Sequence, residues 1–211
     1  MEVGRPAPGE ELNSGDVTVP RPAATVMVLR GGADTLEVLL VQRNPAARFM
    51  GGAWVFPGGA VDKNEGHGED ALRAAGVREL TEEAGIALAG TDELVPFSRW
   101  ITPAQVKVRF DTWFYLAAMP EGQDPMIDGD EIVGWHWYRP AEALQAATDG
   151  QILLVFPTIK HLEQIAAFDS ADSLIEHARG RKVLPVEPRV LITGETARVL
   201  LPGEPGYEDV A

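Results

Sequence analysis

The nine residues from Arg78 to Ile86 carry three carboxylates, those of Glu79, Glu82 and Glu83. On a helix, positions 82 and 83 follow position 79 by three and four residues, so the three side chains crowd one side. Like charges at this spacing destabilise an isolated helix by roughly 0.2–0.5 kcal/mol per pair. A divalent cation would offset that repulsion, and Mg²⁺ prefers oxygen ligands and bridges carboxylates to phosphate oxygens. The pattern predicts a metal site for phosphate chemistry, with an acidic, solvated helix face as the alternative.

Two nearby features favour the metal site. Arg78 precedes Glu82 by four residues, a spacing at which the guanidinium can pair with that carboxylate and orient it. Upstream, the Phe-Pro-Gly-Gly string at 56–59 has the composition of a turn, and its glycines can direct a backbone carbonyl and amides toward a ligand.

Taken together, the two segments resemble the box that defines the Nudix hydrolases, Gly-x5-Glu-x7-Arg-Glu-U-x-Glu-Glu-x-Gly-U, where U is a bulky aliphatic residue. Gly59 opens the box, and residues 78–86 match its second half at every specified position. Members of the family hydrolyse a nucleoside diphosphate linked to another moiety, so the resemblance implies that activity here. It also implies a small-molecule nucleotide as the substrate and Mg²⁺ or Mn²⁺ as the cofactor.

The same resemblance implies roles for individual residues. Glu82 and Glu83 correspond to metal ligands. Glu79 corresponds to a ligand or the general base, and the carbonyl of Gly59 to a further ligand. Arg78, Glu79 and Glu82 are the catalytic residues that it implies.

The first half of the box departs from the family pattern. Gly59 and Glu65 keep its five-residue gap, but twelve residues then separate Glu65 from Arg78 where the box has seven. Counting back seven residues from Arg78 leads to Asp70 instead. About five residues are therefore inserted within 63–69, and either Asp70 or Glu65 can be the first acid of the box, a further metal ligand.

The segment 39–59 resembles a narrower pattern, that of the coenzyme A diphosphatases, Leu-Leu-Thr-x-Arg-Ser/Ala-x3-Arg-x3-Gly-x3-Phe-Pro-Gly-Gly. Arg43, Arg48, Gly52 and Phe56 stand at matching positions. Val41 and Asn44 depart from it, where the pattern has Thr and Ser or Ala. Guanidinium groups bind phosphate oxygens in two-point contacts. The resemblance implies substrate contacts from Arg43, Arg48, Phe56 and Gly58; the alternative is that Arg43 ends a strand and Arg48 lies on a loop.

Three further positions are candidates. Trp113 is the best placed of the five tryptophans to stack an adenine, with core packing as the alternative. Family members often add an acid from a late loop, and Asp130 or Glu131 could serve; we take Glu131 as the candidate metal ligand, with a solvated loop as the alternative. His67 and His161 lack the partner spacing of a zinc site and are predicted in solvated or capping roles.

The charge distribution is more informative than the total charge. The chain has 211 residues and a net charge of −14, which argues against nucleic-acid binding and, at first sight, against a phosphorylated substrate. Residues 59–83, however, hold seven acids and three bases, and residues 121–131 hold five acids and no base. A metal cation bound among such acids would make the local charge positive, and a phosphate group would then be attracted. Without cysteine, disulfides and thiolate chemistry are excluded.

Val- and Leu-rich runs predict strands, and apolar spacings of three and four residues predict helices. The expected strands are 24–30, 36–43, 54–56, 94–102, 106–117, 132–138 and 190–193, and the expected helices are 69–84, 140–147, 157–168 and 171–178. Gly85 is the expected stop of the first helix. This order is compatible with the fold that the resemblance implies, a Nudix-type α/β/α sandwich with a mixed β-sheet in which the box forms a loop–helix–loop.

The expected organisation is a flexible N-terminal arm at 1–20, a Nudix hydrolase domain with C-terminal helices at 21–194 and a tail at 195–211. No apolar run approaches the ~20 residues of a membrane span, and the N-terminus lacks the features of a secretory signal, so we expect a cytoplasmic location and no membrane partner. The sequence leaves open whether the protein forms a homodimer.

Three functional hypotheses follow. The leading one is Mg²⁺-dependent hydrolysis of coenzyme A or acyl-coenzyme A to 3′,5′-ADP and phosphopantetheine or its acyl derivative. The second is a diphosphatase for ADP-ribose or another dinucleotide. The third is a non-catalytic Nudix-fold nucleotide sensor, against which the intact Glu79, Glu82 and Glu83 argue.

Overall fold

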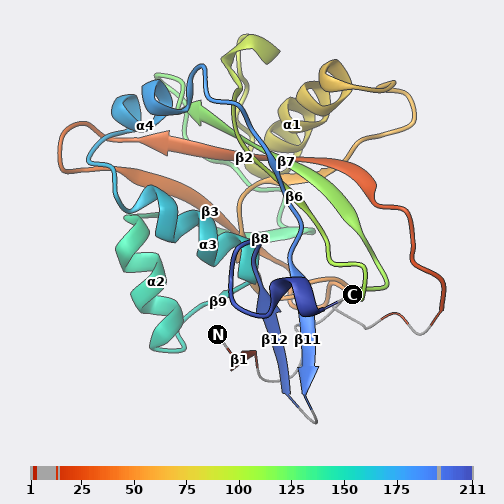
Figure 1. Ribbon diagram of the computed structural model, residues 1–211. Coiled ribbons are helices and arrows are strands. Elements are labelled where there is room, and N and C mark those ends of the chain that lie inside the picture. Colours follow the sequence, from red (N-terminus) through yellow and green to blue (C-terminus); the bar gives the residue numbers. More distant parts are fainter. Residues whose placement is uncertain (1, 4–12, 14, 194–195, 211) are drawn as a thin grey trace.

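A mixed β-sheet of nine strands forms the centre of the computed structural model, which describes residues 2–3, 13, 15–193 and 196–210. Its strands are β2 (Arg21–Arg30), β3 (Glu37–Arg43), β4 (Ala53–Val55), β5 (Gly58–Ala60), β6 (Val95–Ile101), β7 (Phe110–Ala118), β8 (Ile132–Tyr138), β9 (Leu153–Leu154) and β10 (Pro185–Val186). Hydrogen bonds order them as β10-β6-β7-β2-β3-β4-β9, with β5 added on β2 and β8 on β3 (Figure 1). The central strands β2 and β7 are parallel, whereas β3 is antiparallel to β2, β4 and β8.

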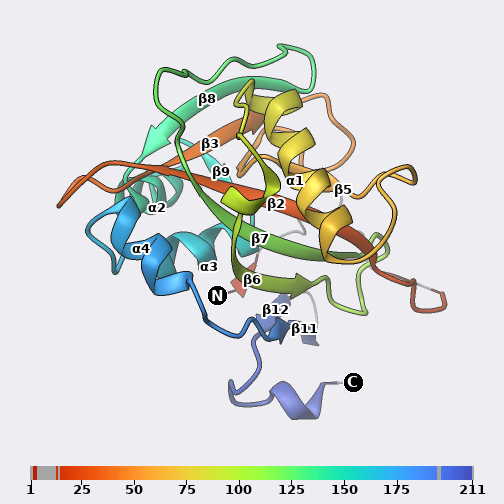
Figure 2. The same ribbon diagram turned by 90° about the horizontal axis from the view of Figure 1, so that it is seen from above.

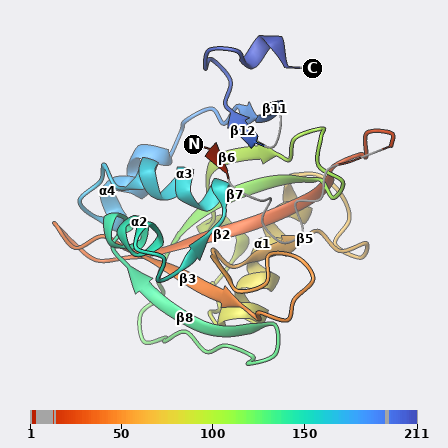
Figure 3. The same cartoon turned by 90° about the horizontal axis from the view of Figure 1, so that it is seen from below.

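Helices cover both faces of this sheet. They are α1 (Glu69–Ala84), α2 (Pro140–Thr148), α3 (Phe156–Ile165) and α4 (Ala171–Ala178). Helix α1 lies on one face, and α2, α3 and α4 lie on the other (Figure 2 and Figure 3). One apolar cluster contains Leu80 of α1 and Val26 of β2, while the other contains Leu162 of α3 and Met27, the next residue of β2. Successive strand residues point to opposite faces, so β2 contributes to both cores and the predicted α/β/α sandwich is confirmed.

Helix α1 ends where the sequence predicts, and a distant loop packs on that end. Gly85 takes the left-handed conformation (φ 65°), and a Cβ there would lie 2.7 Å from the carbonyl oxygen of Met126. The Met126 N–H donates to the carbonyl of Ala84 at 2.8 Å, and the Gln123 side chain exchanges two hydrogen bonds of 2.9 Å with the backbone of Ala87. These contacts bring the acidic segment 121–131 to the end of α1 that carries the predicted acids.

Most predicted elements are confirmed, with some changes of bounds; the helix predicted at 157–168, for example, ends at Ile165. The Phe-Pro-Gly-Gly string is not only a turn: Gly58–Ala60 forms β5, which pairs with Ala23–Thr25 of β2. The strand predicted from Val106 begins only at Phe110, because a turn closed by the hydrogen bond from the Val106 N–H to the carbonyl of Pro103 precedes it. No helix in the described part of the chain has both the length and the apolar character that crossing a membrane requires.

The C-terminal region holds more structure than its composition predicts. Strands β11 (Arg189–Thr193) and β12 (Thr196–Leu200) form a hairpin, and β1 (Glu2–Val3) extends it along β12 (Figure 1). A 3₁₀-helix follows at Tyr207–Asp209. The pairing of β1 with β12 joins the two ends of the chain, a contact that periodicity does not reveal. The prediction of a flexible arm at 1–20 falls mostly on residues that lie outside the described ones.

His161 is buried, which corrects its predicted solvated or capping role. Its side chain on α3 is 0% exposed, and four aromatic rings surround it: Phe56, Phe97, Trp100 and Phe114. Its Nδ1 lies 2.7 Å from the carbonyl oxygen of Pro157, which can only accept, so we assign the proton to Nδ1 and the Ser98 hydroxyl donates to Nε2. Burial lowers the pKa of His161 to about 4.

The buried histidine predicts a loss of stability in mild acid. An unfolded histidine has a pKa of about 6.5, so between pH 6.5 and pH 4 the unfolded chain binds a proton that the folded protein excludes, and the free energy of unfolding falls as the pH falls. When the pH drops from 7 to 4.5, we expect His161→Gln to lose about 2–3 kcal/mol less stability than the unaltered protein. Urea denaturation at both pH values measures this. His67→Gln, at an exposed histidine, should keep the unaltered dependence, and equal losses for His161→Gln and the unaltered protein would contradict the prediction.

Candidate active site

The candidate site lies where the second half of α1 meets β5 and the end of β3. Three acids come from α1, two glycines from β5 and one arginine from the last position of β3: Glu79, Glu82, Glu83, Gly58, Gly59 and Arg43. Strand β2 pairs with both β3 and β5 and packs against α1, so it holds these segments in a fixed relation.

Glu83 is the most buried acid of the site. It is 4% exposed, its Oε2 accepts the Gly58 N–H at 2.8 Å, and its Oε1 lies 3.6 Å from Nη1 of Arg43. Burial first, and the charges of Glu79 and Glu131 to a smaller extent, raise the pKa of Glu83 to about 8, although the Gly58 hydrogen bond and Arg43 act in the opposite direction. A carboxylate in such surroundings needs a nearby cation to be fully charged at neutral pH, as a metal ligand is.

Glu79 packs directly against β5. A Cβ at Gly59 would overlap the Glu79 carboxylate, so glycine at this position leaves room for that carboxylate beside the strand. The side chain of Glu79 is 15% exposed, and burial raises its pKa while Arg78 lowers it. Glu82, by contrast, is 59% exposed at the rim of the site.

Arg78 holds the acids of the box in place. Its Nε lies 2.9 Å from Oε1 of Glu65, and its Nη1 lies 2.8 Å from Glu79 and 2.9 Å from Glu82. Its Nη2 donates to the carbonyl of Ala60 at 3.0 Å and to Oε2 of Glu65 at 3.3 Å. These bonds, that to Glu65 first, raise the pKa of Arg78. The predicted pair of Arg78 with Glu82 is therefore present. Arg78 also bonds to Glu65, a contact that helical spacing does not predict.

The two candidates for the first acid of the box occupy different places. Glu65 has a side chain that is 10% exposed, and it accepts both from Arg78 and from the N–H of Asp62 at 2.6 Å. Asp70 is exposed in the first turn of α1. Thirteen residues of helix, or about 20 Å, separate Asp70 from Glu83. The inserted loop brings Glu65 to the site and leaves Asp70 away from it.

Substitutions at these two acids should have unequal effects. Glu65→Gln removes the charge that Arg78 pairs with, so we expect a 10- to 100-fold lower rate, the usual range for a supporting contact of a metal site, and a loss of roughly 1–2 kcal/mol in stability. Asp70→Asn, the matched control at an exposed acid in the first turn of α1, should remain near the unaltered values. Initial rates and melting temperatures measure both, and similar effects from the two variants would refute the placement of Glu65.

Arg43 joins the two acidic segments. Its Nη2 donates to Oε1 of Glu131 at 2.8 Å, while its Nη1 lies 3.6 Å from Glu83. The Nε of Arg43 is buried without a hydrogen-bond partner among the described residues. The candidate acid Glu131 therefore reaches the site, bonded to an arginine.

Asp128 shapes the turn that carries Glu131, and the sequence analysis missed it. Its carboxylate accepts the N–H groups of Asp130, Glu131 and Ile132 at 3.2, 3.2 and 3.0 Å, and these bonds lower the pKa of Asp128. Asn44, the residue that follows β3, also holds this turn in place. Its backbone N–H donates to the carbonyl of Glu131 and its side-chain amide donates to the carbonyl of Asp130, both at 2.8 Å. The Asp-Gly pair that begins at Asp128 is a turn signal that could have pointed to it.

Of the other predicted substrate contacts, Gly58 lies at these acids, whereas Phe56 packs in the core and Arg48 is on an exposed loop. Phe56 is 3% exposed, with its ring in the core beside His161, so its predicted contact with substrate is replaced by a packing role. The N–H of Gly58 is bonded to Glu83. Arg48 is exposed on the loop between β3 and β4.

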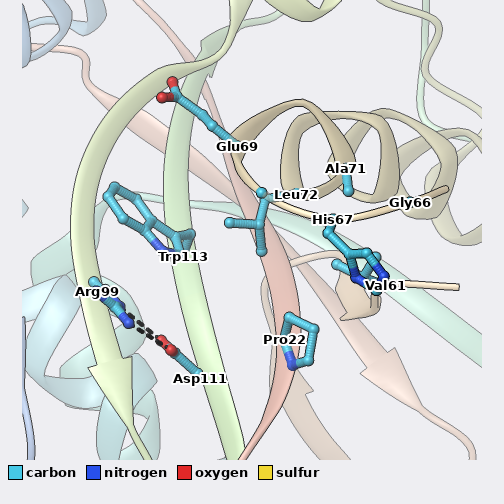
Figure 4. A pocket seen from close by; sticks show the side chains of 11 residues that line it. Pro22, Val61, Gly66, His67, Glu69, Ala71, Leu72, Arg99, Asp111 and Trp113 are labelled. Carbon is cyan, nitrogen blue, oxygen red and sulfur yellow. Dashed lines mark hydrogen bonds and ion pairs between the residues drawn. The ribbon is translucent and has the colours of Figure 1, made fainter. Parts of the chain in front are cut away.

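Trp113 lines a hollow of about 300 Å³ at the beginning of α1 (Figure 4). Its indole stacks beside Tyr115 at 6.3 Å, and the Cζ atom of Arg99 lies 5.7 Å from the ring centre. Leu72, which points into the same hollow, precedes Glu83 by eleven residues, or about 16 Å of helix. Trp113 thus lies near the opposite end of α1 from the buried acid.

The donor set fits a divalent cation, although the described part of the chain holds no preformed metal cluster. Among the described residues, no three acidic or histidine side chains converge as a metal-binding group, and Arg78 and Arg43 lie between the carboxylates instead. Carboxylate oxygens are ligands that Mg²⁺ and Mn²⁺ prefer. Oε1 of Glu83 accepts no hydrogen bond from a described residue, and its contact with Arg43 is an ion pair of 3.6 Å, so a cation could bind there in place of Arg43.

Comparison with known proteins agrees with this fold and site. The NUDIX domain model matches residues 19–156, so the chain belongs to the Nudix family and is a Nudix hydrolase. Nudix hydrolases generally use divalent metal ions and act on small nucleotide substrates.

Three relatives are informative. The crystal structure of a NUDIX hydrolase from Alicyclobacillus acidocaldarius is 27% identical, with a TM-score of 0.67 over 75% of this chain and 96% of that chain. Nudix hydrolase 7 of Caenorhabditis elegans is 28% identical over 83% of this chain and 71% of its own length. The acyl-coenzyme A diphosphatase NUDT19 of Homo sapiens is 32% identical over 116 residues, which are 53% of this chain and 31% of the human protein.

Proposed function

We propose that this Nudix hydrolase cleaves the diphosphate of coenzyme A or acyl-coenzyme A in the presence of Mg²⁺ or Mn²⁺, giving 3′,5′-ADP and phosphopantetheine or its acyl derivative. The observation that carries the metal-dependent activity is the buried carboxylate of Glu83, fixed by the Gly58 N–H beside Glu79. Support for the coenzyme A substrate comes from the pattern at 39–59, which includes Arg43, and from the partial match to the human acyl-coenzyme A diphosphatase.

The metal ligands of the proposal are carboxylates held by the fold. Glu82 and Glu83 bind the cation together with the carbonyl of Gly59, while the Gly58 N–H keeps Glu83 oriented. When bound, the cation neutralises the diphosphate and stabilises the charge that develops on the transferring phosphoryl group. Arg78 holds Glu82 in place.

Glu79 takes the proton of the attacking water, and Arg43 binds the substrate. The water oxygen forms a bond to one phosphorus while the bond from that phosphorus to the bridging oxygen breaks, so the bridging oxygen leaves with the other phosphate. Glu79 accepts the proton of the attacking water, a role that fits its partial burial and its raised pKa. Arg78 orients Glu79 through a bond of 2.8 Å. Arg43 binds phosphate oxygens, for which its planar guanidinium is suited.

A substrate panel tests the proposal. The purified protein is incubated with Mg²⁺ or Mn²⁺ and, separately, with coenzyme A, acyl-coenzyme A, ADP-ribose, NADH and diadenosine polyphosphates, and the products are separated by chromatography. We expect 3′,5′-ADP from the first two substrates. Turnover of ADP-ribose without coenzyme A would overturn the substrate, and binding of nucleotides without any hydrolysis would indicate a sensor.

A further inference from the structure

The hydrogen bond of Arg43 goes to an exposed acid although a buried acid is within reach. Its Nη2 is 2.8 Å from Glu131, whose side chain is 57% exposed, and its Nη1 is 3.6 Å from Glu83, whose side chain is 5% exposed. Opposite charges attract more strongly in a buried, low-dielectric position than in solvent. Without another restraint, Arg43 would therefore close on Glu83 whenever that carboxylate is ionised, as it must be to bind a cation.

The restraint is the turn that Asp128 organises. Asp128 accepts three backbone N–H groups, one of them that of Glu131, and Asn44 binds the carbonyl of Glu131 at 2.8 Å. The backbone of Glu131 is thus fixed on both sides, and its carboxylate is presented to Arg43. The buried Nε of Arg43 has no partner among the described residues, so Glu131 supplies the one short bond that positions the guanidinium.

We propose that Glu131 is the tether of Arg43 and not a metal ligand. By holding the guanidinium off Glu83, it leaves Oε1 of that carboxylate open to the cation and keeps Arg43 in place for the diphosphate. This inference rests on the proposed function, because it takes Glu83 as a metal ligand. Glu131 and Asp128 are positioning residues in this scheme.

Release of the tether should weaken metal binding. A freed Arg43 closes on Glu83 and competes with the cation for it. We expect Glu131→Asp, which keeps the charge but shortens the side chain, to raise the Mn²⁺ dissociation constant about three- to tenfold, the size of one coupled pair. Electron paramagnetic resonance titration of Mn²⁺ without substrate measures this, so the readout does not depend on activity.

Asp128→Asn should also weaken Mn²⁺ binding, because it loosens the turn that holds Glu131. The amide group that replaces one carboxylate oxygen cannot accept the N–H of Glu131, so the turn loosens while Glu131 and Arg43 stay intact. We expect weaker Mn²⁺ binding in the same range. Asp124→Asn, the same change at an exposed position of the same segment, is the control and should bind Mn²⁺ as the unaltered protein does.

A double substitution separates a tether from a ligand. Arg43→Gln removes the competing cation and should tighten Mn²⁺ binding, and in that background Glu131→Asp should have no further effect. Equal weakening by Glu131→Asp in both backgrounds would show direct ligation and overturn the tether, as would unaltered Mn²⁺ binding by Glu131→Asp alone. Glu83→Gln tests the metal site itself: loss of Mn²⁺ binding supports it, and an unaltered protein that binds no Mn²⁺ would refute the metal site and the tether together.

Discussion

Replacement of Glu83 by Gln is expected to lower kcat/KM for the diphosphate substrate by on the order of 10²–10³-fold, the range typical of losing one preorganised electrostatic group. The amide keeps the size of the side chain and can still accept the Gly58 N–H, but it carries no charge for a cation. The fold should persist, because a neutral amide avoids the cost of burying a charge at a position that is 4% exposed. Initial rates at saturating Mg²⁺ and a thermal melt measure the two effects.

Glu69→Gln is the matched control for that experiment. Glu69 begins the same helix, its side chain is 66% exposed, and its one ion pair among the described residues is with Arg73. Removal of its charge should therefore change neither rate nor melting temperature appreciably. Unchanged turnover by Glu83→Gln would remove Glu83 from the metal site.

Replacement of Arg78 by Ala should cause the largest loss of stability. The guanidinium is bonded to Glu65 and Glu79, whose side chains are only 10% and 15% exposed, and its removal leaves both carboxylates without their cation. Because breaking a buried pair costs 3–5 kcal/mol and Arg78 is 25% exposed, we expect a loss of about 2–4 kcal/mol. Activity should fall as well, since Glu79 and Glu82 lose the bonds that orient them. Urea denaturation and initial rates test this.

A second variant shows whether stranded charge causes that loss. In Arg78→Ala combined with Glu65→Gln, one of the two stranded charges is neutralised, so the double variant should be more stable than the sum of the single losses indicates. Strict additivity would mean that Arg78 acts through packing and not through Glu65.

The acids of α1 could be predicted from the sequence because their relation is local. A helix converts spacings of three and four residues into one face, so the order of Glu79, Glu82 and Glu83 determines that they lie together. The stop at Gly85 is equally local, since a helix often ends at a left-handed residue that glycine adopts without strain. The Nudix fold followed from the motif, and the family match confirms it.

Burial was harder to predict than secondary structure. His161 is a polar residue, yet the apolar face of α3 carries it into the core, where Ser98 and Pro157 satisfy both ring nitrogens. Phe56 matches a substrate-binding pattern, yet its ring packs against the same histidine. In both cases the packing of α3 on the sheet decides the environment, and residue type alone does not.

The sequence by itself thus determined the chemistry that this protein has available: a helix face of carboxylates, an arginine beside them and a glycine turn before them. Only the tertiary structure decided which groups meet. Glu65 and Asp70 satisfy the box equally by counting, and the path of the inserted loop selects Glu65. Arg43 and Glu131 are 88 residues apart, and they bond because β3 and the loop after β7 converge at the end of α1. The carboxylates of one helix face can be predicted along the chain because local backbone geometry sets their spacing. Contacts across the sheet cannot, because they depend on how all the layers pack.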